Sequence, residues 1–151
     1  MRYLKKLVFL MLVQALFVGT TFAATPEQAK ALAEKAAAYA KEVGPDKAFE
    51  AFTSKDPKWH EHDLYVFALG FDGQMLANGA NKAMVGKNMM EMRDINGVYM
   101  TKEGINVVKT KGAGWVDYMF SNPETKKIQA KSSYHVRIPN YDGLVGVGIY
   151  K

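Results

Sequence analysis

The sequence contains no cysteine in its 151 residues. This absence excludes disulfide bonds, thiol catalysis and a lipoprotein anchor attached through cysteine. Stability must therefore come from the packing of apolar side chains, which make up 48% of the chain. A chain of this length is long enough for one domain with its own hydrophobic core. The sequence shows no internal repeat, low-complexity tract or second domain.

The chain also lacks an apolar run long enough to predict a transmembrane helix. Residues 7–18 are apolar except for Gln14, but a helix that crosses a bilayer needs roughly 20 apolar residues. Three cationic side chains precede this run, namely Arg2, Lys5 and Lys6. A short apolar run after a basic start is typical of a cleaved export signal.

The small residues Thr21 and Ala23 predict cleavage after Ala23. Residues 1–23 then form the signal peptide, residues 24–151 form the single mature domain, and we expect a periplasmic or secreted protein. Cleavage removes three cations and lowers the formal net charge from +5 to +2. So small a charge argues against nucleic acid as a partner.

The mature chain begins with helical patterns and continues with strand patterns. Thr25 to Gln28 is typical of a capped helix start, and Gly44-Pro45 is typical of a helix end. Short helices are expected over residues 45–54 and 98–111. Apolar runs and turn signals predict strands at residues 64–71, 75–77, 114–120, 128–138 and 144–150. This order predicts an α+β domain with helices packed on an antiparallel sheet.

Six short strings along this order are more specific than the element pattern. They are DLYVF at 63–67, DGQMLA at 72–77, VGKN at 85–88, GWVDY at 114–118, KSSY at 131–134 and GVGIY at 146–150. In this order they resemble the single Cache domain family of the second type, over nearly the whole mature chain. Two positions depart from the family pattern: Asn78-Gly79, where a histidine-proline pair is common, and Gly104 in the crossing helix.

The resemblance implies a PAS-like fold with a long N-terminal helix packed on a five-stranded antiparallel sheet. It also implies an extracytoplasmic sensor that binds a small metabolite, such as a short organic carboxylate, and signals through a receptor or kinase partner. The narrow alanine stripe of the first helix, with Tyr39 to one side, adds the hypothesis of a homodimer through that helix.

An anion site needs cationic or hydroxyl donors and apolar walls that exclude water. The best donors are Lys131, Tyr118, Tyr134 and Asn78, and the expected walls are Trp115, Tyr65, Phe67 and Met90. The resemblance favours Lys131 and Tyr118 among them.

Strand geometry separates some of these candidates. Because side chains alternate along a strand, Lys131 and Tyr134 face opposite sides unless a bulge intervenes, and we favour Lys131 for the pocket. For the same reason Trp115 and Tyr118 are expected on different faces of their strand.

Three other functions fit the sequence less well. Metal handling would use His60, His62 and the methionines, although no pattern of a third ligand lies near the two histidines. Catalysis would need Ser132 or Ser133 with His135 and Asp117, and the chain has no nucleophile elbow, phosphate loop or metalloprotease motif. A ligand-free interaction module would fill the pocket with its own aromatic side chains. We predict no enzyme activity and no cofactor.

Overall fold

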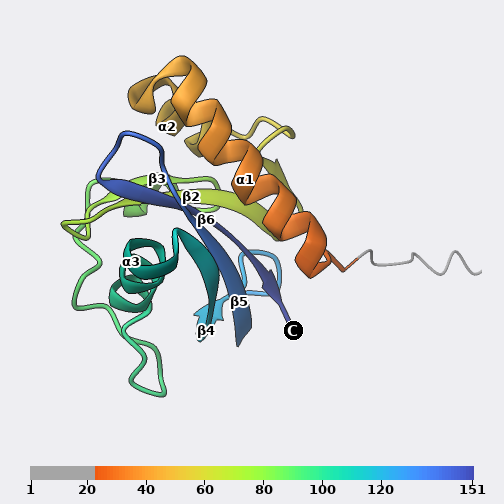
Figure 1. Ribbon diagram of the computed structural model, residues 1–151. Helices are drawn as coiled ribbons and strands as arrows, with labels where there is room; N and C mark the ends of the chain where they lie inside the picture. Colours follow the sequence, from red (N-terminus) through yellow and green to blue (C-terminus); the bar gives the residue numbers. More distant parts are fainter. Residues whose placement is uncertain (1–22) are drawn as a thin grey trace, which may run out of the picture.

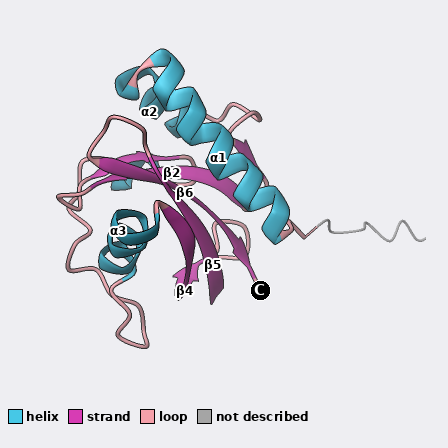
Figure 2. Cartoon of the chain, viewed as in Figure 1, coloured by secondary structure: helices cyan, strands magenta, loops and turns pink. Residues whose placement is uncertain are grey.

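The computed structural model describes residues 23–151, and the predicted signal peptide lies outside this range apart from Ala23. The chain runs in the order α1 (Pro26–Val43), α2 (Pro45–Thr53), β1 (His60–Glu61), β2 (Leu64–Gly70) and β3 (Met75–Asn78). A 3₁₀ turn (Lys82–Met84), α3 (Met100–Lys111), β4 (Ala113–Ser121), β5 (Ile128–Arg137) and β6 (Gly143–Tyr150) follow. Figures 1 and 2 show the sheet with α1 and α3 on opposite sides.

Helix α1 begins and ends where the sequence predicts. The hydroxyl of Thr25 accepts a hydrogen bond from the backbone NH of Gln28 at 3.2 Å. In return, the side-chain carbonyl of Gln28 accepts one from the NH of Thr25 at 2.8 Å. Gly44, at φ 89°, ends the helix in a conformation that side chains rarely adopt.

The strands form one antiparallel sheet in the order β1-β2-β6-β5-β4. Strand β3 also pairs with β2, on the side away from β6. All five predicted strands are present, and the predicted α+β architecture with helices packed on an antiparallel sheet is confirmed. The sheet has one strand more than the five we predicted. The additional strand is β1, and its two residues are too few to form a recognisable alternating pattern.

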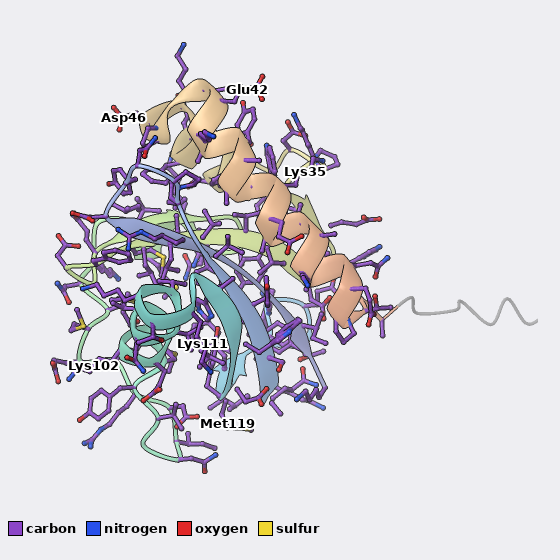
Figure 3. The ribbon with its side chains drawn as sticks, viewed as in Figure 1. Lys35, Glu42, Asp46, Lys102, Lys111 and Met119 are labelled. Carbon is purple, nitrogen blue, oxygen red and sulfur yellow. The ribbon has the colours of Figure 1, made fainter. Side chains whose placement is uncertain are left out.

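One face of the sheet packs against α1 and α2. The stripe of buried alanines on α1 allows its backbone to approach strands β5 and β6 closely. Charged side chains such as Lys35 and Glu42 lie on the outer side of α1 (Figure 3). The core on this face contains residues from α1, α2 and the strands, among them Ala33, Ala36, Phe52, Val66, Val145 and Val147.

The other face of the sheet packs against α3 and the loop that precedes it. Ile105 and Val108 of α3 join Phe67, Leu69 and Leu144 in a second buried cluster. No helix among residues 23–151 is long and apolar enough to cross a membrane.

The two tryptophans, Trp59 and Trp115, differ in burial, and substituting each one tests which of them belongs to the main core. Trp59 is 1% exposed, and its ring centroid lies 4.9 Å from those of both Tyr39 and Phe52. Trp59→Ala is expected to lower the free energy of unfolding by about 3–5 kcal/mol, because it leaves a cavity in a packed core. Trp115→Ala should cost clearly less, since Trp115 is 38% exposed. Urea denaturation of both variants measures the difference, and equal losses would contradict this assignment of the core.

Candidate functional site

A cavity lies between the α3 face of the sheet and the loop that precedes α3. Its volume, counted as space open to the centre of a water molecule, is about 40 Å³. The lining combines aromatic rings, methionines and a few polar side chains: Tyr65, Phe67, Leu69, Met75, Asn78, Met84, Met89, Met92, Met100, Thr101, Tyr118, Phe120, Lys131 and His135.

Lys131 is placed in this cavity by the middle of the sheet. Strand β5 is paired on both sides, so Lys131 lies between Tyr118 of β4 and Tyr150 of β6. Gly148 lies two residues before Tyr150 on β6, and a Cβ atom there would collide with the Lys131 side chain. Gly148 therefore provides the space that the lysine side chain occupies.

The ammonium group of Lys131 has an unusual set of neighbours. The residue is 2% exposed, and Nζ donates a hydrogen bond to the hydroxyl oxygen of Tyr65 at 2.8 Å. No carboxylate forms an ion pair with it among the described residues. Nζ instead lies 4.3–5.7 Å from four ring centroids, those of Tyr65, Tyr150, Phe120 and Phe67.

Two effects act on this group in opposite directions. Burial lowers the pKa of Lys131 to about 7, and only the more distant charge of Asp63 raises it. The faces of the four rings carry negative charge density and favour the ammonium form. The amino group is therefore largely shielded from bulk solvent, and no carboxylate among residues 23–151 pairs with it.

Two further polar groups line the cavity beside Lys131. The hydroxyls of Tyr118 and Ser133 are hydrogen-bonded at 2.8 Å, and burial raises the pKa of Tyr118. The side-chain carbonyl of Asn78 accepts hydrogen bonds from the backbone NH groups of Ala80 and Asn81 at 3.0 and 2.8 Å. These bonds fix the orientation of the Asn78 amide.

The amide nitrogen of Asn78 consequently points toward two thioethers. It lies 4.0 Å from the sulfur of Met75 and 3.7 Å from that of Met84. Sulfur is a weak acceptor, so the Asn78 amide still has donor capacity for a stronger acceptor.

His135 is a lining residue that the sequence singled out only as a candidate base. It is 2% exposed, burial lowers its pKa to about 4, and Nδ1 has no hydrogen-bond partner among residues 23–151. A Cβ atom at Gly104 would lie 2.9 Å from Cδ2 and Nε2 of this ring. Gly104 thus allows α3 to pack directly on His135.

Five of the eight predicted site residues line the cavity, and three do not. Strand β5 pairs regularly, without a bulge, so Tyr134 lies on the face opposite Lys131, where Nζ of Lys30 is 5.6 Å from its ring centroid. Trp115 shares that face, and its ring centroid is 5.1 Å from that of Tyr134. Met90 is partly buried outside the lining, and its neighbours Met89 and Met92 line the cavity instead.

The sequence missed Phe120 and Tyr150 as members of the site. Phe120 follows Tyr118 by two positions on β4, and Tyr150 is the register partner of Lys131. The two-residue period predicts the first of these positions. The second depends on which strand lies beside β5.

A second hollow, of about 290 Å³, adjoins the cavity. It shares Tyr65, Asn78 and Phe120 with the cavity, together with Met84 and Met92. Its outer lining includes Ser121, at the end of β4, and Pro123 and Lys126 from the turn between β4 and β5. The shared side chains show that the two hollows adjoin beside this turn.

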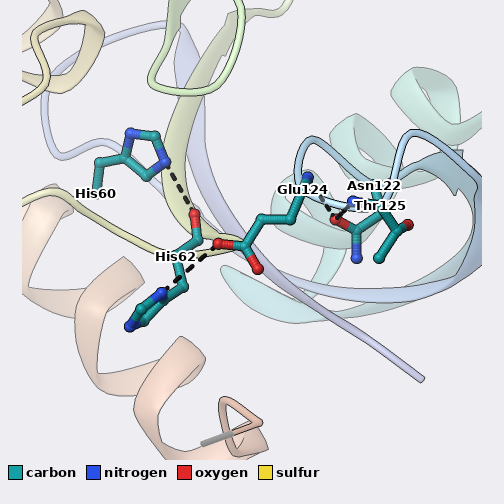
Figure 4. Close-up of polar contacts among 5 residues, drawn as sticks. All are labelled: His60, His62, Asn122, Glu124 and Thr125. Atoms are coloured by element: carbon teal, nitrogen blue, oxygen red, sulfur yellow. Dashed lines mark hydrogen bonds and ion pairs between the residues drawn. The ribbon is translucent and has the colours of Figure 1, made fainter. Parts of the chain in front are cut away.

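The histidines that suggested a metal site make other contacts (Figure 4). His60 Nε2 is 3.0 Å from the backbone oxygen of His62, and His62 Nδ1 is 3.6 Å from a carboxylate oxygen of Glu124. Within residues 23–151, no three His, Cys, Asp or Glu side chains are grouped so that they could hold a metal ion. The His62–Glu124 pair links the β1–β2 hairpin to the β4–β5 turn.

The residues considered for catalysis are divided between the two faces of the sheet. Ser132 is hydrogen-bonded to Asp117 on the α1 side, whereas Ser133 and His135 lie on the cavity side. The hydroxyl of Ser133 pairs with Tyr118. These side chains do not form the nucleophile, base and acid sequence of a hydrolase.

The domain has a long N-terminal helix on one face of its sheet and a small cavity on the face that packs against α3. This is the architecture of an extracytoplasmic sensor domain. The Single Cache domain 2 family matches residues 22–151, and the chain belongs to this family. Cache domains are sensor modules.

Two curated relatives are similar over part of the chain. One is the sensor histidine kinase MctS of Rhizobium johnstonii, 28% identical over 88 residues, which are 58% of this chain and 19% of that protein. The other is the methyl-accepting chemotaxis protein McpP of Pseudomonas putida, 24% identical over 91 residues, which are 60% of this chain and 17% of that protein. The matched part is less than a fifth of the length of each relative.

Solved structures show the same fold. The periplasmic sensor domain of a chemotaxis protein has a TM-score of 0.64 and 26% identity, with 82% of this chain and 88% of that chain covered. A Cache chemosensory domain described for carboxylic acid recognition has a TM-score of 0.65 and 20% identity, with 82% and 86% covered. At that identity the second structure is evidence of a common fold.

The buried ammonium predicts a dependence of stability on pH. The pKa of Lys131 is about 7 in the folded protein and ordinary, about 10.4, in the unfolded chain. Between these values the unfolded chain binds the extra proton, so stability rises with pH by about 1 kcal/mol per unit. Stability is then lost as pH falls toward 7. Lys131→Met should remove this slope.

Denaturation of the wild type and of Lys131→Met at pH 7, 8 and 9 measures the difference between their slopes. His135 does not contribute in this window, because its pKa is lowered to about 4. The buried tyrosines, whose pKa values are raised, act only above about pH 10. Parallel curves for the two proteins would show that Lys131 keeps its proton throughout.

Proposed function

We propose that this chain is an exported sensor module that reversibly binds a short organic carboxylate and passes the signal to a partner protein. The observation that supports this proposal is the environment of Lys131, a buried amino group that lines a cavity and has no ion-pair partner among residues 23–151. A carboxylate would supply the missing negative charge and accept charge-assisted hydrogen bonds in a medium of low dielectric constant.

The size of the cavity favours a small ligand. A cavity of about 40 Å³ would admit only a ligand of a few heavy atoms, such as a carboxylate with two or three carbons. The amide nitrogen of Asn78 and the hydroxyl of Tyr118 would add donors, and Phe67 with the methionines would exclude water.

The known proteins support the general class. The two curated relatives are a histidine kinase and a chemoreceptor, and one solved neighbour is a Cache domain described for carboxylic acid recognition. A receptor or kinase is accordingly the proposed partner of this chain, with residues 1–23 as its export signal.

The proposal predicts that acetate, lactate or pyruvate raises the melting temperature of the protein. A ligand at a hundredfold excess over its Kd stabilises the folded state by about 2.7 kcal/mol. Lys131→Met should abolish the shift while the domain stays folded, because it removes a buried charge and keeps similar side-chain volume. Loss of this contact corresponds to roughly ten- to hundredfold in affinity.

Two tyrosine variants are matched controls for this experiment. Tyr118→Phe should weaken binding less than Lys131→Met, since it removes one hydroxyl from the lining and keeps the wall. Tyr134→Phe should bind like the wild type, because Tyr134 lies on the other face of the sheet. The anion site is wrong if no carboxylate shifts the melt, or if Lys131→Met responds like the wild type.

The proposed homodimer would form through the outer face of α1. Ala31 and Ala38 are exposed on this face, seven positions apart, and the charged residues Glu34 and Lys35 lie between them. This small and mixed-charge surface would allow a second α1 to approach closely. Sedimentation should detect a dimer, and Ala38→Glu should weaken it more than Lys111→Glu, an exposed change on α3. A monomer at all concentrations, with and without carboxylate, would reject the dimer.

A further inference from the structure

Lys131 differs from the other lysines of the domain in its surroundings. It is the one buried lysine among residues 23–151. Exposed lysines such as Lys102 and Lys151 have carboxylate partners, Glu91 at 2.8 Å and Asp117 at 3.2 Å. Within the described part of the chain, the amino group of Lys131 instead lies near four aromatic rings and donates a hydrogen bond to the phenol of Tyr65. Such surroundings permit the amine to lose its proton without breaking an ion pair.

A neutral lysine amine is a nucleophile, whereas an ammonium is not. Desolvation in an apolar pocket is one of the ways in which proteins activate lysine toward carbonyl groups. With a pKa of about 7, Lys131 is neutral in a fraction roughly a thousandfold larger at pH 7 than an ordinary lysine. The amine also lines a cavity that can hold a small molecule.

From this placement we propose that Lys131 captures small aldehydes and α-keto acids covalently, as a reversible imine between Nζ and the carbonyl carbon of the ligand. The inference rests on the proposed function in one respect, because it places the ligand in the same cavity. It extends the ligand class from carboxylates to carbonyl compounds.

The reaction balances without an oxidant, a reductant or a further reactant. The lone pair of Nζ forms a bond to the carbonyl carbon, and the π electrons move to the carbonyl oxygen. Proton transfer from nitrogen to oxygen gives a carbinolamine. The nitrogen lone pair then expels the hydroxyl group, which takes up a proton and leaves as water, and an iminium with a C=N bond remains. Loss of the remaining N–H proton gives the neutral imine and makes good the proton that the hydroxyl group took up. Water reverses each step and releases the ligand.

Tyr65 is placed to handle the proton in these steps. Its hydroxyl oxygen lies 2.8 Å from Nζ of Lys131 and 3.5 Å from the hydroxyl of Tyr150. Tyr150 in turn donates to the backbone oxygen of Ser121 at 2.9 Å, beside the outer hollow. Burial raises the pKa of Tyr65 well above its ordinary value, so that the phenol stays protonated and able to donate. Tyr65 is thus a positioning and proton-transfer partner of the amine.

The remaining polar groups fit an α-keto acid. Its carboxylate is attached to the reacting carbon, and the amide nitrogen of Asn78 has only weak sulfur acceptors in the same cavity. Asn78 would hold this carboxylate when Lys131 reacts as the neutral amine. In the ammonium form Lys131 would hold a simple carboxylate directly, so one side chain serves both ligand classes.

Reductive trapping tests the proposal on the folded protein at pH 7. Propanal and pyruvate are the carbonyl probes, propanoate is the probe without a reactive carbonyl, and sodium cyanoborohydride reduces an imine to a stable amine. Peptide mapping by mass spectrometry then locates the adduct. We expect Lys131 to be modified at least about tenfold faster than any exposed lysine. Propanoate should form no adduct and should slow the reaction at Lys131 by occupying the cavity.

Three variants show which residues the trapping reaction requires. Lys131→Met should abolish the fast adduct, and Lys30→Met, which removes an exposed lysine on the opposite side of the sheet, should leave it unchanged. Tyr65→Phe should slow capture of propanal across the pH range while Lys131 remains the modified residue.

The outcomes separate the imine from the proposed carboxylate site. Equal modification of all lysines, or no adduct at Lys131, would overturn the imine. If propanoate and pyruvate still raise the melting temperature in that case, the carboxylate site stands alone. A fast Lys131 adduct with propanal in a protein that no carboxylate stabilises would support the imine and reject the carboxylate site.

Discussion

The double-sided pairing of β5 is the constraint on which both halves of this domain depend. Hydrogen bonds to β4 and β6 fix the register of β5 without a bulge, so alternate side chains must point to opposite faces. One set, with Tyr134, packs toward α1, and the other, with Lys131, Ser133 and His135, lines the cavity side. A slip of one residue would exchange the two sets and place the lysine against the alanine stripe.

The cavity face also depends on residues that have no side chain. Gly148 leaves space for the side chain of Lys131, Gly146 does so for the ring of Phe67, and Gly104 does so for His135. Two of these glycines lie in β6 and one lies in α3, so the site exists only when both elements are packed on β5. Glycine at position 104 has a structural reason, because a larger residue would meet the buried imidazole of His135.

The chemistry of the site follows from this packing. A lysine on the surface would be a solvated cation with little selectivity, but Lys131 is buried among four aromatic rings, and no carboxylate of residues 23–151 pairs with it. The polar groups around it are fixed by the protein, as the Tyr118–Ser133 pair and the anchored Asn78 show. A ligand that binds such groups in the folded state alone would stabilise the domain.

Local patterns in the sequence determined the elements and the family. The capping residues of α1, the turn residues and the two-residue periods act over a few positions, so they predicted the helices, the five longer strands and the opposition of Lys131 to Tyr134. Tertiary packing decided the rest of the site. Trp115 and Tyr134 pack together outside the cavity. Met89 and Met92 line the cavity while Met90 does not, and Tyr150 lies beside Lys131. These contacts join residues distant in sequence, and only strand order and the packing of α3 bring them together.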